Sequence, residues 1–163
     1  MRKKEVTGFS KEQALNRAAS LCSGCEYCTS QIQEKLLSWG ISDKDTNDII
    51  DHLIDEKFID NMRFARAYCH DKFYYNNWGR IKIGQMLRHL HISDTEITEG
   101  MTAIPDEEYL LTLTNVLRKK DRSLHETDNY QRKGKLVRHL LSHGFEMELV
   151  LDVVDDYLSQ ERD

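Results

Sequence analysis

The sequence predicts an all-α fold, a tandem array of three three-helix repeats that is elongated and curved. Three observations lead to this prediction. The 163 residues are rich in leucine, isoleucine, glutamate, lysine and arginine, which favour helices, and they include one proline. Runs of valine and threonine, which would indicate strands, do not occur in the sequence. Most informative, one segment recurs three times at offsets of 51 and 53 residues.

The repeated segment aligns on Gly40, His91 and Gly144. Ahead of each, two apolar residues four apart share one helical face, and another apolar residue follows the aligned position. Glycine adopts the left-handed conformation that commonly ends a helix, so Gly40 and Gly144 are expected to be helix stops. Histidine tolerates that conformation less well, so the turn at His91 is expected to differ. The aligned apolar sets are Ile32, Leu36 and Ile41; Ile83, Leu87 and Ile92; and Leu136, Leu140 and Phe145.

Each unit begins with a further helix. Ser10 and Gln13 have the spacing of a capping box, and Asp60 is a good N-cap residue. Pro105 precedes three acidic residues, which is typical of a helix start. The helices that begin at these signals are expected to run to about Leu21, Tyr75 and Lys120.

The last helix of the first two units opens at a capping box, beginning at Ser42 and Ser93. The third unit lacks a good cap residue near Glu146. Polar residues without periodicity predict a flexible connection over Asp121–Asn129. One unit buries too little apolar surface to be stable alone, so neighbouring units should stack. The expected repeats span residues 9–58, 59–104 and 105–160.

The charge of the chain is negative overall, with a formal net charge of −5 and a pI of about 5.8. This balance argues against a protein that coats nucleic acid by bulk electrostatics. No stretch of about 18 apolar residues occurs, and the charged run Met1–Glu5 is not followed by the apolar segment of a secretory signal. We therefore expect a monomer in a reducing cytoplasm, without membrane association.

Basic residues gather in two zones, residues 60–90 and 118–138, whereas acids gather in residues 43–56 and in the tail from Glu146 to Asp163. Aromatic residues interleave the first basic zone. Such a surface could grip a phosphate backbone or an acidic protein groove. Alternatively, the charges are solvated faces and the aromatics are core residues. The aromatics are Phe64, Tyr68, Phe73, Tyr74, Tyr75 and Trp78.

Residues Phe58–Tyr68 resemble the signature of the RecX family, in which an isoleucine-acid turn leads into an Arg-Phe-Ala helix. Trp78–Ile83 resembles the segment that opens the next helix of that family. Arg132–Phe145 is similar to the family's third-repeat pattern, and Ala14–Ala18 and Lys35–Leu36 fit its first. The likeness covers nearly the whole chain.

The resemblance implies a bacterial regulatory protein of tandem three-helix repeats that binds RecA. Family members lie in the groove of the RecA–single-stranded-DNA filament and limit filament growth, strand exchange, ATP hydrolysis and co-protease activity. The implied processes are DNA repair, homologous recombination and the SOS response. Contact with single-stranded DNA would be indirect or weak, and neither enzymatic activity nor a cofactor is expected.

The basic residues of the second and third units are the candidate partner-binding set. Arg63 and Arg66 could instead form intramolecular ion pairs. A structural role is expected for four signature residues: Asp60 as a cap, Phe64 in the core, Gly79 in a close turn and Gly144 as a helix stop. The partner-binding candidates are Arg63, Arg66, Arg80, Lys82, Arg88, Lys133 and Arg138.

The run Cys22, Cys25 and Cys28 supports a different interpretation, because its spacing occurs in zinc and iron–sulfur sites. A fourth ligand would have to come from Cys69 or His70. Because no second Cys-x-x-Cys pair follows, free thiols and no metal are the preferred expectation. Two alternatives to RecA regulation thus stay open, a stand-alone helical nucleic-acid-binding module and a metal- or redox-sensing helical protein.

Overall fold

The computed structural model describes residues 8–161, so the run Met1–Glu5 and the end of the acidic tail lie outside it. Within this range the chain forms nine α-helices and no strand, which confirms the all-α prediction. The helices are α1 (Lys11–Gly24), α2 (Thr29–Ser38), α3 (Asp43–Asp55), α4 (Asn61–Asn76), α5 (Arg80–His89), α6 (Asp94–Met101), α7 (Asp106–Ser123), α8 (Asn129–Ser142) and α9 (Met147–Gln160).

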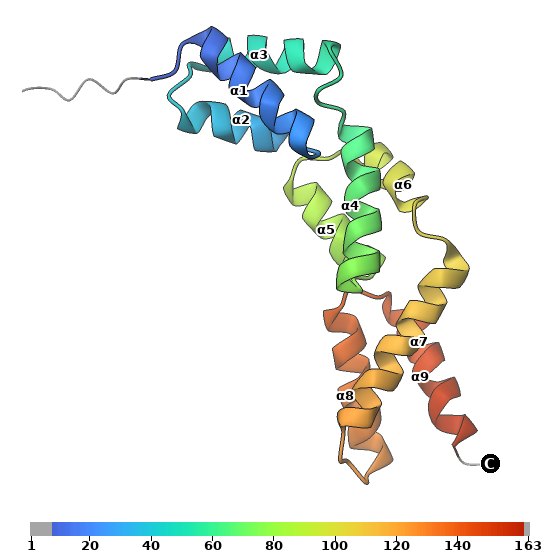
Figure 1. The fold of residues 1–163 in the computed structure, drawn as a ribbon. Coiled ribbons are helices and arrows are strands. Elements are labelled where there is room, and N and C mark those ends of the chain that lie inside the picture. The colour runs from blue at the N-terminus through green and yellow to red at the C-terminus, as the bar shows by residue number, and fades with distance from the viewer. Residues whose placement is uncertain (1–7, 162–163) are drawn as a thin grey trace, which may run out of the picture.

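The helices follow one another in groups of three along an elongated, bent molecule (Figure 1). The first unit, α1–α3, lies at one end and the third unit, α7–α9, at the other. The second unit, α4–α6, lies between them. The tandem helical array predicted from the repeat is therefore the observed architecture.

The middle helix of every unit ends in the same backbone motif. After α2, the amide of Ile41 donates to the carbonyl of Leu36, and Gly40 has a φ of 82°. This pattern is a Schellman motif, with a buried apolar residue closing the turn. Equivalent bonds join Ile92 to Leu87 after α5 and Phe145 to Leu140 after α8.

The expectation that His91 would make a different turn is wrong. Its φ is 60°, in the same left-handed region as Gly40 and as Gly144 at 90°. The amide of His91 donates to the carbonyl of Arg88, and burial of Ile92 completes the motif. Hydrogen bonds and packing in the turn thus outweigh the preference of histidine for other conformations.

The helix starts follow the predicted caps, with one difference at Ser42. Ser10 and Ser93 each form a reciprocal capping box, and the Asp60 carboxylate accepts from the amide of Arg63. Ser42 caps α3 by accepting from Asp45, but without the reciprocal bond of a box. The expected connection over residues 121–129 is shorter than predicted, because α7 continues to residue 123 and α8 begins at residue 129.

Two separate apolar cores stabilise the chain. The first unit packs around its own cluster, which includes Ile32, Leu36 and Leu53. The second and third units share one larger cluster that runs from Phe73 in α4 to Leu140 in α8. Stacking of neighbouring units therefore applies fully to the second and third, which form one body, whereas the first carries a core of its own.

Polar contacts fix the first unit to the second. The amide of Thr29 donates to the Asn61 side chain at 2.9 Å, and the Ser30 hydroxyl donates to the carbonyl of Leu90 at 2.7 Å. Cys28 is fully buried and belongs to the core of the other two units. The start of α2 thus contacts the first residue of α4 and the residue that ends α5.

Candidate partner-binding surface

Arg63 and Arg66 form intramolecular ion pairs, the alternative that their sequence left open. Arg63 Nε lies 2.6 Å from Glu26, and its Nη2 donates to the carbonyl oxygens of Lys57 and Phe58. Arg63 thereby ties α4 to the first unit. Arg66 lies 3.2 Å from a Glu99 oxygen on α6, and both side chains are about half exposed.

Arg80 holds the junction between the second and third units. Its guanidinium lies 3.9 Å from the centre of the Tyr109 ring, 2.5 Å from Asp106 and 3.8 Å from Glu146. The Tyr109 hydroxyl accepts from the Arg80 amide and donates to Glu146 at 2.6 Å. Burial and the bond to Glu146 raise the pKa of Tyr109 well above its usual value. Arg80 therefore connects α5, α7 and the start of α9.

Arg88 and Lys133 form exposed ion pairs, with Asp94 at 3.1 Å and Asp155 at 2.5 Å. Exposed pairs of this kind contribute about 0–1 kcal/mol, so a partner's acidic group can replace the internal one at little cost. Among residues 8–161, Lys82 and Arg138 form no ion pair. The charged groups of Arg80, Lys82 and Arg88 contact different neighbours, which are Asp106, the Trp78 ring and Asp94 respectively.

The four signature residues all have structural positions. Asp60 caps α4 and Phe64 is buried in the core. Gly79 lies directly against Gly144, where a Cβ would overlap the carbonyl group of Gly144. A Cβ on Gly144 would in turn overlap Lys82. These two glycines permit contact between the backbones of the second and third units.

Two lysines flank a half-buried tryptophan at that junction. Lys72 Nζ lies 5.0 Å and Lys82 Nζ 4.4 Å from the Trp78 ring centre. Within the described chain neither lysine has an acidic partner. Cation–π contact holds the ammonium groups in place without neutralising their charge.

A groove of about 360 Å³ lies between α7 and α8. Lys119, Lys120, His139 and His143 line it around Val116, and no acid does. Burial, then the charges of His143 and Lys120, lower the pKa of His139, so its imidazole is neutral near pH 7. Lys119 and Lys120 have no acidic residue beside them in the groove lining and would attract an anion.

One residue of the groove lining contacts the residue that precedes Trp78. The His143 ring nitrogen Nδ1 lies 2.9 Å from the carbonyl of Asn77, the residue before Trp78. All four lysines lie in the basic zones of the sequence, but only Lys82 is among the predicted partner residues, because the contact between the two units cannot be deduced from sequence spacing. We call this surface, made of Lys72, Lys82, Lys119 and Lys120, the basic strip.

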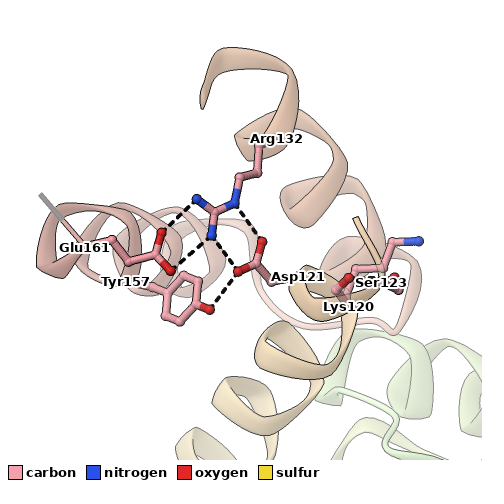
Figure 2. Close-up of polar contacts among 6 residues, drawn as sticks. All are labelled: Lys120, Asp121, Ser123, Arg132, Tyr157 and Glu161. Atoms are coloured by element: carbon pink, nitrogen blue, oxygen red, sulfur yellow. Dashed lines mark hydrogen bonds and ion pairs between the residues drawn. The ribbon is translucent and has the colours of Figure 1, made fainter. Parts of the chain in front are cut away.

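An ion-pair network fixes the far end of α7, from which Lys120 projects (Figure 2). Arg132 Nε donates to one oxygen of Asp121 at 2.7 Å and Nη2 to the other at 2.6 Å. Arg132 also bonds Glu161, and the Tyr157 hydroxyl donates to Asp121 at 2.8 Å. The Asp121 side chain is 9% exposed, so these bonds are shielded from water and lower its pKa. Helices α7, α8 and α9 are joined at this point.

A second groove, of about 580 Å³, runs along α8 beside α9. Lys133 and Arg138, both predicted partner residues, line it together with Tyr130 and Leu151. This α8–α9 groove is distinct from the basic strip, because the two share no lining residue.

The cysteines do not gather into a metal centre. Cys25 is exposed, whereas Cys28 and Cys69 are buried. Burial raises the pKa of the Cys69 thiol to about 11, which is unsuited to a thiolate ligand near neutral pH. Across residues 8–161 no three histidine, cysteine or acidic side chains are grouped as metal ligands would be.

Two segments of the chain match family models of three-helix domains, in agreement with the fold and the repeat. Residues 60–101 match the family described as "RecX, second three-helix domain", and residues 106–154 match "RecX, third three-helix domain". Together the two matches cover more than half of the chain.

No helix in residues 8–161 is both long and apolar enough to cross a membrane.

Curated relatives carry the name "Regulatory protein RecX". The relative from Clostridium tetani is 32% identical over 130 residues, which are 78% of this chain and 59% of the relative. The relative from Haemophilus influenzae is 23% identical over 90% of this chain and 96% of its own length. The chain thus spans less than two thirds of the Clostridium tetani relative and nearly all of the Haemophilus influenzae relative.

Among solved structures, the crystal structure of RecX from Lactobacillus salivarius has a TM-score of 0.79 at 20% identity. The match covers 90% of this chain and 95% of that one. A second crystal structure of regulatory protein RecX has a TM-score of 0.77. Both show the same fold.

Proposed function

The chain belongs to the RecX family of regulatory proteins, and from this premise we propose that it binds the RecA–single-stranded-DNA filament and restrains RecA. The restrained activities would be strand exchange, ATP hydrolysis and co-protease activity. The protein would act in the cytoplasm. The proposed role is binding by a monomer, without catalysis or a cofactor.

The basic strip is the observation that carries the proposal. Its four lysines have no acidic partner within the described chain, although the protein is acidic overall. An uncompensated charge on a rigid junction is available for an acidic partner surface or for phosphates. The bent, elongated shape in Figure 1 supports contact with several neighbouring protomers of a filament.

The seven candidate residues fall into three groups under this proposal. Lys82 and Arg138 would contact the partner directly. The exposed ion pairs of Arg66, Arg88 and Lys133 would exchange for partner groups, whereas Arg63 would mainly hold α4 against the first unit. Arg80 contributes to the surface mainly by holding the junction, because its guanidinium stacks on Tyr109.

Charge reversal on the basic strip tests the proposal. Lys82→Glu/Lys119→Glu should weaken co-sedimentation with RecA filaments about tenfold or more, at unchanged helicity. A matched control is Lys35→Glu/Lys44→Glu in the first unit, which has the same change in net charge and should bind like the unmodified protein. Equal binding by both variants would exclude the basic strip as the contact surface.

Direct binding of single-stranded DNA is the second candidate function. The pairing of unneutralised lysines with Trp78 favours it, because such surfaces hold phosphates and stack bases. If four strip lysines each neutralise one phosphate, the logarithm of the affinity should fall with the logarithm of salt with a slope of about −3. An affinity for DNA without RecA that does not change with salt would exclude this candidate.

A further inference from the structure

Gly134 lies in the middle of α8 although nothing in the fold requires a glycine there. A Cβ at this position would meet only the Arg138 guanidinium, at 3.9 Å, which is ordinary van der Waals contact. Its φ is not in the left-handed range. Gly79 and Gly144 differ, since a Cβ on either would overlap backbone or Lys82 atoms. A helix-interior glycine costs about 1 kcal/mol relative to alanine, so this one lowers stability without a packing reason.

The space left by Gly134 opens the α8–α9 groove. Gly134, Val137 and Leu151 line the groove, with Tyr130 beside them. Tyr130 is 85% exposed and Leu151 37% exposed, so apolar atoms dominate the accessible lining. A larger side chain at position 134 would fill the groove from its α8 side.

The charge of the groove is positive and its lining contains no acid. Arg138 has no ion pair among the described residues, and Lys133 has only its exposed pair with Asp155. An apolar surface beside cations fits a protein segment that presents an apolar side chain next to carboxylates. A phosphate backbone fits the basic strip better, because the α7–α8 groove is lined mainly by cationic and imidazole groups.

We propose that the α8–α9 groove binds an acidic segment of the partner protein, with one apolar side chain of that segment seated against Gly134. This inference rests on the proposed function, since the partner protein would be RecA in its filament. It adds a contact with a protein segment at α8 and α9 to the filament contact proposed for the basic strip.

Substitution of Gly134 can fill the groove without destabilising the fold, so a loss of binding can be distinguished from a loss of folding. Gly134→Leu replaces a poor helix former with a good one, so the free energy of unfolding should not fall. Its affinity for RecA filaments should fall about tenfold or more. Gly24→Leu is the matched control, because Gly24 is an exposed helical glycine with no neighbour within 4 Å of a Cβ. This control should bind like the unmodified protein.

A photo-crosslinking amino acid identifies what occupies the groove. Benzoylphenylalanine in place of Tyr130 should form an adduct with the RecA chain, while the same replacement of exposed Tyr75 on α4 should not form that adduct. Retained affinity in Gly134→Leu, an adduct with DNA, or no adduct at position 130 would each overturn the inference. Failure of the unmodified protein to bind filaments would instead overturn the proposed function on which it rests.

Discussion

The amide of Gly79 donates a hydrogen bond of 2.7 Å to the carbonyl of His143, and so joins the start of α5 to the end of α8. The next contact in this junction runs from the amide of Ile81 to the carbonyl of Gly144 at 3.0 Å. Two middle helices from different repeats are therefore linked through their backbones. The basic strip depends on this link, because Lys72 and Lys82 belong to the second unit and Lys119 and Lys120 to the third.

Gly79→Ala should break the link. A Cβ would overlap the Gly144 backbone, so the free energy of unfolding should fall by about 2 kcal/mol or more. Gly84→Ala in the same helix is the control, since its Cβ would meet the movable Arg88 guanidinium at 3.3 Å. Urea denaturation of both variants checks the difference. Equal stability of the two would mean that the junction adapts without cost.

The ion pair between Asp121 and Arg132 should make the free energy of unfolding depend on pH in the acidic range. The folded protein lowers the pKa of Asp121 below its unfolded value of about 3.9, chiefly through the bonds from Arg132. A carboxyl with a lowered pKa stabilises the fold above the unfolded pKa, and this contribution disappears as pH falls through the folded pKa. Stability should therefore decline below about pH 4.

Asp121→Asn tests that assignment. At pH 7 the free energy of unfolding of the variant should be about 2 kcal/mol lower, because Arg132 and Tyr157 lose a charged acceptor. The difference from the unmodified protein should shrink as pH is lowered through 4 to 2. A constant difference over that range, measured by urea denaturation, would show that the charge of Asp121 does not contribute.

Removal of a buried side chain from one of the two apolar cores should leave the other core unaffected. Leu53→Ala in the first unit and Leu117→Ala in the third each remove a fully buried side chain, which costs about 2–5 kcal/mol. Hydrogen exchange should quicken in α1–α3 for Leu53→Ala. It should quicken throughout α4–α9 for Leu117→Ala, because the second and third units share one core. Faster exchange across the whole chain in both variants would contradict two separate cores.

Local patterns in the sequence predict most of this fold. The spacing of Ile32 and Leu36, and of their equivalents, predicts the buried helical faces, and Ser10, Asp60 and Ser93 predict helix starts. Residue preference alone predicts the wrong turn at His91, because the left-handed turn depends on the burial of Ile92 and on bonds back to α5. The polar residue Asp121 predicts an earlier end to α7, but α7 continues to Ser123 because Arg132 neutralises Asp121 in the fold.

The candidate surface was harder to predict, since it depends on residues distant in the chain. The basic zones were visible, but not which cations were already neutralised. Arg80 meets Glu146 across 66 positions, and Lys82 meets Gly144 across a unit junction. Likewise, Lys120 and His139 share a groove only once α7 and α8 pack side by side. Pairing of charges across units cannot be deduced from repeat spacing.

ATP hydrolysis by RecA on single-stranded DNA is the most direct test of the central claim. Added to preformed filaments at increasing concentration, the protein should lower the hydrolysis rate and sediment with the filaments. Lys82→Glu/Lys119→Glu should require about ten times more protein for the same inhibition, whereas Lys35→Glu/Lys44→Glu should match the unmodified protein. An unchanged hydrolysis rate without co-sedimentation, at concentrations where the protein is folded, would contradict the proposed regulation of RecA.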